Sequence, residues 1–409
     1  MPPNKLKRGL LVPLILTTLA FAAQNDTLTT TTKTKTDKHI FDAYIKVGLG
    51  YDSNPYYTPD KSYNDYTASG GGALVNPDVK SGVFIPISLK ADYEYRLKQN
   101  IRLLGDFKLK ARKFTDSSLS NADETKTQAR AGVRFRLNKY KKEIDKIEFK
   151  VFAADIDKTY VDHDDGSAKR TVGGDQSNRY KYKKIGAELE YTYDFKKLDL
   201  FFRAMYEDRD YGTPATWSSL DHTYMKLKAQ AGYQLSKALH LQGYYQYSVR
   251  DYKERKSYEI VGTNINLVNP GVNLTYNDIK LSADYKVSKK YKIKFDYLLS
   301  QRKDDNKGYS DYLYSSITLS NKYKFSKKLR ASLKLKYHKY NYENAYAYDT
   351  STTQSKKESD GYKISINANY KLSKNWATSL NLDYRDMSAT DKRYEYKQTV
   401  AMINMKYIF

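Results

Sequence analysis

Seven short segments of nearly the same sequence divide the chain, and they restrict its fold more than any other feature. Each has an aromatic residue, any residue, an aliphatic residue or Phe, a polar residue, and then Lys or Gln. The segments are Tyr95–Gln99, Phe135–Lys139, Tyr193–Lys197, Tyr233–Lys237, Tyr285–Lys289, Tyr323–Lys327 and Tyr370–Lys374. The distance between copies varies, so each copy is expected to connect two longer elements.

Apolar and polar residues alternate on both sides of these segments, which is the period of a strand with two different faces. Around Ser326, the apolar face carries Leu319, Tyr323, Phe325, Leu329, Ala331, Leu333, Leu335 and Tyr337. We therefore predict that each repeated segment is a short hairpin turn. The same alternation also suits a soluble β-sandwich, so the fold class depends on three further features.

The first is the N-terminus, which has the pattern of a secretory signal peptide. Basic residues at positions 5–8 precede an apolar run at 9–22, and alanines at its end supply an A-x-A cleavage site. We predict a signal peptide at residues 1–23, a flexible Thr-rich periplasmic lead at residues 24–38, and one barrel domain at residues 39–409.

Composition excludes several other classes of protein. The chain carries a net charge of +24 and no Cys, and its mean hydropathy is −0.78. It has no interior run of about 18 apolar residues, so no transmembrane helix is expected. Because the sequence has no Cys, we expect neither a lipid anchor nor a disulfide framework. An exported chain with no basic helix and no nucleic-acid motif is expected to have no nucleic-acid partner.

The second feature is the C-terminus, where alternate residues share an apolar face and the last residue is Phe. The members of that face include Ile403, Met405, Tyr407 and Phe409. This segment resembles the terminal strand that bacterial outer-membrane barrels present to their assembly machinery. The resemblance implies the barrel assembly machinery as a partner.

The third feature is the strand count. One strand before the seven hairpins, fourteen within them and one after give sixteen, and an even number suits a single-chain bacterial barrel. The other connections are longer and polar, at about 52–81, 116–124, 161–178, 210–221, 253–271, 304–308, 343–360 and 388–392. We predict an all-β fold: a single transmembrane, antiparallel, up-and-down β-barrel of about 16 strands with short periplasmic turns and longer extracellular loops. A change of phase near Asn277 predicts a bulge or a shifted register there.

The repeated aromatic residue falls near the end of each strand, where an amphipathic ring can lie among lipid headgroups. We predict a periplasmic aromatic girdle of Tyr95, Phe135, Tyr193, Tyr233, Tyr285, Tyr323 and Tyr370. Outer-membrane lipid and lipopolysaccharide are the expected surroundings. A homotrimer is one expected assembly.

The face opposite the apolar row is basic. We predict pore-lining basic residues at Arg102, Lys108, Lys110, Arg130, Arg134, Arg203, Lys228, Lys292, Lys294, Arg330, Lys334 and Lys336. Sixteen strands leave an aqueous bore, and an excess of Lys and Arg along it favours small anionic solutes. Alternatively, these cations pair with lumen carboxylates and leave little field at the axis.

Three segments are candidates for further functional sites. Asp162–Gly166 could hold a divalent cation but lacks the spacing of a Ca²⁺ loop, and a solvated tip or one bound to lipopolysaccharide through divalent ions is the alternative. Asp221 and His222 suggest a hydrolase without the rest of a catalytic constellation. The loop at 52–81 could fold into the bore as a constriction. We predict no catalytic residue, no metal site, no cofactor and no enzyme activity.

Gly50–Asn54 (Gly-Tyr-Asp-Ser-Asn) closes the first predicted strand. With the signal peptide, the Tyr-rich strands and the terminal Phe, it resembles the porin-type outer-membrane barrels of Gram-negative bacteria. The resemblance implies an integral outer-membrane location. A passive channel for small hydrophilic, preferentially anionic solutes is the first functional hypothesis. The alternatives are an export barrel for an acidic polysaccharide or polypeptide, and a non-conducting surface or adhesin barrel.

Overall fold

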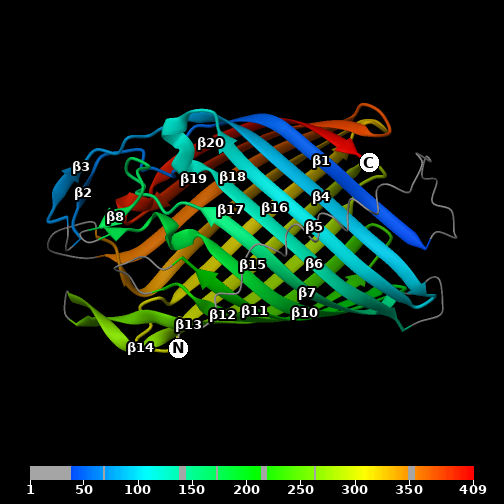
Figure 1. The fold of residues 1–409 in the computed structure, drawn as a ribbon, viewed down its shortest axis with the longest axis horizontal. Helices are drawn as coiled ribbons and strands as arrows, with labels where there is room; N and C mark the ends of the chain where they lie inside the picture. The colour runs from blue at the N-terminus through cyan, green and yellow to red at the C-terminus, as the bar shows by residue number, and fades with distance from the viewer. Residues whose placement is uncertain are drawn as a thin grey trace, which may run out of the picture. The chain divides into compact units, whose positions relative to one another are not determined.

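The strands close into one antiparallel barrel, in which each strand pairs with its neighbours along the chain and β1 pairs with β20. The computed structural model describes residues 38–67, 70–137, 144–171, 174–212, 219–261, 264–348 and 355–409. The predicted signal peptide and all of the predicted lead except Lys38 lie outside these residues. Figure 1 shows the strands crossing the barrel obliquely.

Sixteen strands form the barrel, as the sequence predicted. They are β1 (His39–Asp52), β4 (Gly82–Lys98), β5 (Ile101–Phe114), β6 (Glu124–Arg136), β7 (Ile144–Lys158), β10 (Tyr182–Phe195), β11 (Leu198–Tyr211), β12 (His222–Gln234), β13 (Leu239–Val261), β14 (Asn264–Lys286), β15 (Tyr291–Asp304), β16 (Tyr312–Lys324), β17 (Leu329–Tyr346), β18 (Lys356–Lys371), β19 (Trp376–Ala389) and β20 (Tyr396–Ile408).

The connections differ at the two ends of the barrel. The repeated segments connect strands at one end, here called the turn end, and the longer connections lie at the other, the loop end. The loops contain the small sheets β2 (Tyr63–Asp65) with β3 (Ala73–Val75) and β8 (Arg170–Thr171) with β9 (Gly174–Asp175), and the 3₁₀ helices η1 (Ser117–Ala122), η2 (Ser177–Tyr180) and η3 (Lys392–Tyr394). None of the helices among the described residues has the length and apolar character of a membrane span.

The polar residue of the repeated segment has a structural role at the turn. The Ser326 hydroxyl accepts hydrogen bonds from the backbone N–H groups of Lys328 (3.1 Å) and Leu329 (3.0 Å). Ser236 and Ser288 accept the equivalent pairs of bonds in their own turns. A side chain that satisfies turn N–H groups stabilises the tight connection, which explains why Ser occupies this position in four of the seven segments.

Alternate side chains face two different surroundings. On β17, Leu333, Leu335 and Tyr337 are exposed on the outer face, whereas Lys334 and Lys336 lie on the inner face. Exposed apolar side chains continue around the barrel, from β1 to β20. So large an apolar surface on a closed barrel is the signature of contact with lipid.

The predicted girdle residues all lie on the outer face near the turn end. They are Tyr95, Phe135, Tyr193, Tyr233, Tyr285, Tyr323 and Tyr370. On β20, the predicted terminal residues Ile403, Met405, Tyr407 and Phe409 share the outer face. The ring of Tyr407 packs against Trp376 at 4.9 Å and Phe409 at 5.0 Å between centroids.

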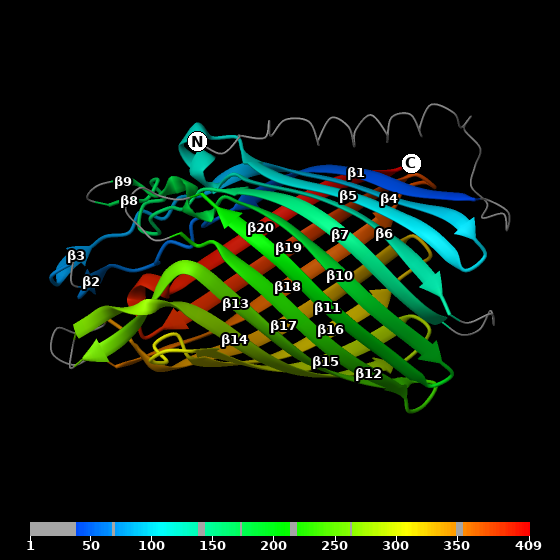
Figure 2. The same ribbon diagram turned by 60° about the horizontal axis from the view of Figure 1, so that its bottom comes forward.

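The sequence-based prediction was wrong for the extent of two loops and for the position of one irregularity. The segment 253–271 was expected to be a loop, but β13 and β14 continue through most of it and project past the barrel (Figure 2). Likewise β17 and β18 extend into the predicted loop 343–360. Beyond the apolar belt both faces of a strand meet water, so the alternation that identifies a strand is lost.

The bulge expected near Asn277 is also absent. The pairing of β13 with β14 is continuous around this residue, and the register shifts between Asp251 and Ser257 instead. Asn277 stays on the outer face, where its side-chain oxygen accepts a hydrogen bond from the Tyr245 hydroxyl at 2.7 Å. A polar residue within the apolar row therefore reflects a local partner and not a change of phase.

The seam between β1 and β20 closes the barrel. Pairing runs from Tyr44 with Ile408 to Asp52 with Val400, and the Phe409 N–H donates to the Ala43 carbonyl at 3.1 Å. Gly48 permits the close approach of the two strands, because a Cβ there would lie 2.2 Å from the Ile403 carbonyl oxygen.

We predict that Gly48→Val weakens closure by about 1–3 kcal/mol, the usual cost of overpacking. Urea unfolding of the barrel from lipid vesicles measures this change. Gly105→Val is the matched control, because its Cβ would meet only Tyr93 Cβ at 3.9 Å. Equal stability of the two variants would contradict the seam contact.

Candidate functional site

The twelve predicted pore-lining cations all lie on the inner face, but they fall into two groups. Six have a carboxylate within 4.0 Å: Arg102, Lys108, Arg130, Arg134, Arg203 and Lys294. The other six have no such partner among the described residues: Lys110, Lys228, Lys292, Arg330, Lys334 and Lys336. The alternative of complete pairing, considered from the sequence, therefore applies to only one part of the wall.

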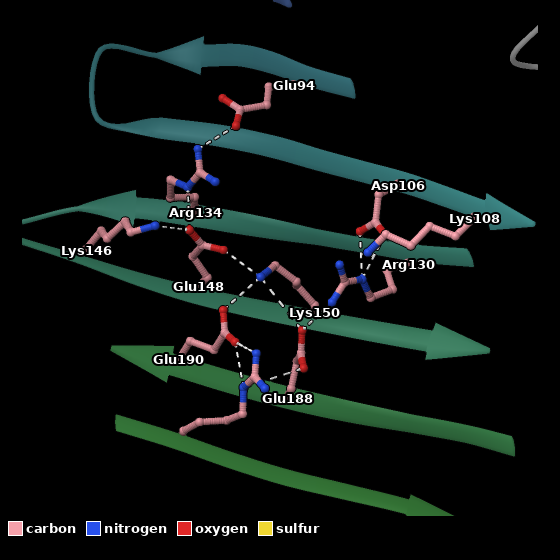
Figure 3. Close-up of polar contacts among 11 residues, drawn as sticks. Glu94, Asp106, Lys108, Arg130, Arg134, Lys146, Glu148, Lys150, Glu188 and Glu190 are labelled. Atoms are coloured by element: carbon pink, nitrogen blue, oxygen red, sulfur yellow. Dashed lines mark hydrogen bonds and ion pairs between the residues drawn. The ribbon is translucent and has the colours of Figure 1, made fainter. Parts of the chain in front are cut away.

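The paired group is organised around Glu148 on β7, whose side chain is 5% exposed. Its carboxylate accepts hydrogen bonds from Arg134 Nε and Lys146 Nζ, both at 2.6 Å, and Lys150 Nζ lies 2.6 Å from its second oxygen. Figure 3 shows these side chains converging from neighbouring strands. Several cations around one buried carboxylate compensate for its lost hydration.

The network extends across β4 to β11. Lys150 continues it to Glu190 at 2.9 Å, which also accepts a hydrogen bond from Arg203 Nε at 2.6 Å. Arg130 Nε bonds both oxygens of Asp106, at 2.8 and 2.9 Å (Figure 3). On this paired wall (β4 to β11), five of the six predicted cations have a carboxylate partner, Lys110 being the exception.

The rest of the inner surface, here called the cationic wall (β12 to β18), has fewer carboxylates. Lys292 on β15 lies opposite Lys286 on β14 and Lys322 on β16, and Lys324 lies opposite Arg330. Like charges opposite one another destabilise a sheet. Stability therefore gives no reason for this arrangement, which makes it a candidate for function.

The cationic wall does contain some ion pairs. Asp296 lies 3.1 Å from Lys280 Nζ and 3.6 Å from Lys294 Nζ, and Lys363 Nζ lies 3.2 Å from Asp383. Lys228 and Lys336 instead lie over aromatic rings, the nearest at 4.2 Å and 5.6 Å from the ring centroids. A cation over a ring keeps its full positive charge, whereas a carboxylate would neutralise it.

At the loop end, residues after β1 fold inward against the paired wall and β20. Asp52 is fully buried, is bonded by the Gln398 amide (2.9 and 3.1 Å), and forms an ion pair with Arg112 (3.1 Å). The buried Tyr56 ring packs with Leu119 and Ala122 of η1. The first part of the loop at 52–81 is thus held on inner-face residues.

A second loop fixes this inward segment. The His163 ring nitrogen Nδ1 lies 2.5 Å from the Tyr56 carbonyl oxygen, and the Tyr63 hydroxyl donates to Asp164 at 2.8 Å. Gly166 has a φ of +72° and approaches the Tyr56 ring so closely that a Cβ would lie 2.0 Å from it. The segment Asp162–Gly166, here called the clamp, therefore packs against the inward segment, while His163 and Asp165 remain exposed.

The titratable groups of this clamp respond to burial. Burial raises the pKa of the Tyr56 hydroxyl to about 12. Burial also raises the pKa of Asp164. Burial also tends to raise the pKa of Asp162, but the hydrogen bond from Lys169 outweighs it, and the pKa of Asp162 lies below its ordinary value. Among the described residues no group of three or more acidic, His or Cys side chains could hold a metal ion.

Asp221 and His222 do not form a catalytic pair. The His222 ring is buried between Tyr211 and Tyr252, and its Nδ1 lies 2.8 Å from the Leu220 carbonyl. Asp221 instead accepts a hydrogen bond from the Tyr211 N–H at 2.6 Å. Both residues stabilise the start of β12.

Sequence reasoning missed the aromatic residues of the inner face. Tyr224, Tyr276 and Tyr312 alternate with outer-face residues on their strands and lie beside inner-face arginines. The signal was present, because inner positions of these strands carry Tyr and Arg near the loop end.

Comparison with known proteins identifies the fold. No family model and no curated protein matches the chain. Among solved structures, a loop L8 deletion mutant of OmpT, an outer membrane protein of Vibrio cholerae, matches with a TM-score of 0.50 and 14% identity, over 91% of this chain and 100% of that one. Salmonella typhi OmpF in complex with daunomycin matches with a TM-score of 0.49 and 12% identity, over 91% and 98%.

The chain has the fold of the bacterial outer-membrane β-barrels. At this level of identity the likeness concerns the fold alone. The apolar outer belt adds an independent argument, because a closed barrel with such a belt spans a membrane, and bacterial proteins of this kind lie in the outer membrane. The barrel is therefore an integral outer-membrane protein.

We predict that Glu148→Gln destabilises the barrel by about 2–4 kcal/mol, because it leaves several buried cations without their shared carboxylate. Unfolding in urea from lipid vesicles measures the change. The control Lys110→Gln removes a cation that has no carboxylate partner and should change stability by less than about 0.5 kcal/mol. A loss of similar size in both variants would show that the network is not what stabilises this wall.

We also predict that Gly166→Val releases the inward segment, because its side chain would occupy the space of the Tyr56 ring. Proteolysis of the folded barrel in detergent, with a protease that cleaves after aromatic residues, should then cut near Tyr56 faster than in the unmodified protein. Gly243→Val, with its nearest neighbour 3.4 Å from the Cβ, is the control. Unchanged cleavage in Gly166→Val would argue against the clamp.

Proposed function

We propose that the barrel is a non-enzymatic channel for small hydrophilic solutes and that it prefers anions. The observation that carries the proposal is the division of the inner surface. On the paired wall five of the six predicted cations have a carboxylate partner, whereas the cationic wall keeps Lys228, Lys292, Arg330, Lys334 and Lys336 without a carboxylate partner among the described residues. The uncompensated charge then acts on solutes in the lumen.

Coulomb's law gives the expected size of the preference. One unit charge about 10 Å away attracts an anion by about 0.4 kcal/mol in bulk water. Screening over a Debye length of about 8 Å at physiological salt reduces this to roughly a third. Five or six such charges together supply somewhat under 1 kcal/mol, which enriches anions in the lumen about threefold over bulk solution. A larger preference requires lower salt or a narrower passage.

The inward segment at the loop end is the proposed constriction. Asp52 and Tyr56 are buried by inner-face and loop residues, so the segment between them is held over part of the mouth. The outer-face aromatic residues at the turn end, including Tyr233 and Tyr323, are the proposed contacts with lipid headgroups. The signal peptide and lead proposed at residues 1–38 would deliver the chain to the periplasm.

We predict that Lys334→Gln with Lys336→Gln lowers the anion-to-cation permeability ratio by about a third to a half, because two uncompensated charges are lost. The reversal potential of the purified barrel in a planar bilayer under a KCl gradient measures this ratio. The control pair Lys363→Gln with Asp383→Asn lies on neighbouring strands and leaves the net charge unchanged, so the ratio should stay the same.

Other outcomes separate this proposal from its alternatives. A cation-selective channel, or an unchanged ratio in the Lys334 and Lys336 variant, would refute the charge argument. Absence of conductance in a folded barrel would favour a non-conducting surface protein. Conductance that appears only with a periplasmic partner would favour an export barrel.

A further inference from the structure

A row of cations and tyrosines, which alternate except at the adjacent Tyr312 and Tyr342, crosses the inner face near the loop end. We call it the cation–tyrosine row; its members are Arg209, Tyr224, Arg250, Tyr276, Arg302, Tyr312, Tyr342 and Lys357. They come from the eight consecutive strands β11 to β18. Neither the ion-pair network nor the seam explains why these residue types alternate.

The first half of the row runs from β11 to β14. The guanidinium carbon of Arg209 lies 4.8 Å from the centre of the Tyr224 ring. Arg250 lies between two rings, 5.9 Å from Tyr224 and 5.1 Å from Tyr276. Each contact is within the range of a cation–π interaction.

The second half continues without a gap. Tyr276 lies directly opposite Arg302 in the pairing of β14 with β15. The guanidinium carbon of Arg302 lies 4.2 Å from the Tyr312 ring and 5.9 Å from the Tyr342 ring. On β18, Lys357 Nζ lies 5.5 Å from the centre of the Tyr342 ring.

The central cations of the row have charge to offer a ligand. Arg250, Arg302 and Lys357 have no carboxylate within 4.0 Å among the described residues. The buried Nε of Arg250 also lacks a hydrogen-bond partner in the part of the chain that the structure describes. The guanidinium groups of Arg250 and Arg302 suit a carboxylate, because the planar fork of a guanidinium matches the two carboxylate oxygens.

The tyrosines add a different kind of contact. A ring is a flat apolar surface with a polar hydroxyl at one end, and it suits a ligand that is itself flat on one face and polar at its edge. A sugar ring has such a face of C–H groups, and a sugar acid adds a carboxylate. Across eight strands at about 4.8 Å spacing the row is roughly 34 Å long, which exceeds one sugar and suits a chain of several.

We propose that the cation–tyrosine row binds an acidic oligosaccharide, a chain of sugar acids, within the lumen. The inference rests on the proposed channel, whose substrate class it specifies. Tyrosine rings contact the sugar faces, and the intervening Arg and Lys side chains bind the carboxylates. The cationic wall below the row then supplies the field that draws the polymer along the barrel.

The experiment is current blockage of the purified full-length barrel in a planar bilayer. A hexamer of galacturonic acid should block the current at a concentration about tenfold lower than maltohexaose, a neutral chain of the same length. Galacturonic acid itself should block only at much higher concentration. Equal blockage by the neutral hexamer, or none by the acidic one, would overturn the proposal.

Variants separate this site from the general anion preference. Tyr276→Leu should raise the half-blocking concentration of the acidic hexamer about fivefold without changing the KCl reversal potential, and Tyr276→Phe should restore the block. The Lys334 and Lys336 variant should change the reversal potential far more than the block. If Tyr276→Leu behaves like the unmodified barrel, the tyrosines do not bind the ligand.

Binding can be tested even if the barrel does not conduct. Fluorescence anisotropy of a labelled galacturonate hexamer with the barrel in detergent measures affinity directly. Saturable binding that Arg250→Gln weakens about tenfold would support the row while the channel proposal fails. Absence of saturable binding to a folded barrel would reject the row whether or not the barrel conducts.

Discussion

Closure of the sheet is the constraint on which the rest of the structure depends. A strand in lipid must satisfy every backbone N–H and C=O group within the protein, and only a sheet with no free edge does so. The pairing of β1 with β20 completes that condition here. Once the sheet is closed, each strand separates lipid from lumen. Alternate residues of the sequence therefore face lipid on the outside and water on the inside.

The lumen side uses that division unevenly. Around Glu148 the cations and carboxylates compensate one another, as buried charges must. Across β12 to β18 fewer of the cations have a carboxylate partner, and Lys228 and Lys336 lie over aromatic rings. Lys and Arg thus stabilise one wall through ion pairs and are available to solutes on the other. Amino-acid composition alone does not distinguish these two roles.

The sequence predicted the strands well where one face meets lipid. Apolar alternation located the turn ends of both strands of the hairpin at Ser326 to within a residue, but missed their loop ends by three and four residues. It failed beyond the belt, where β13 and β14 continue without an apolar row, and at Asn277, whose partner Tyr245 lies on another strand. Pairing among Glu148, Arg134 and Lys150 depends on register between strands, which no local pattern contains.

The serine-capped turns have an implication for how such a chain changes in size. In four of the seven turns a serine hydroxyl of the turn accepts hydrogen bonds from backbone N–H groups of the same turn, as Ser326 does. A hairpin with its turn is therefore a local unit of the chain. Duplication or loss of one such unit alters the circumference by two strands and leaves β1 and β20 in position to meet, so the cylinder can widen or narrow without a new way of closing.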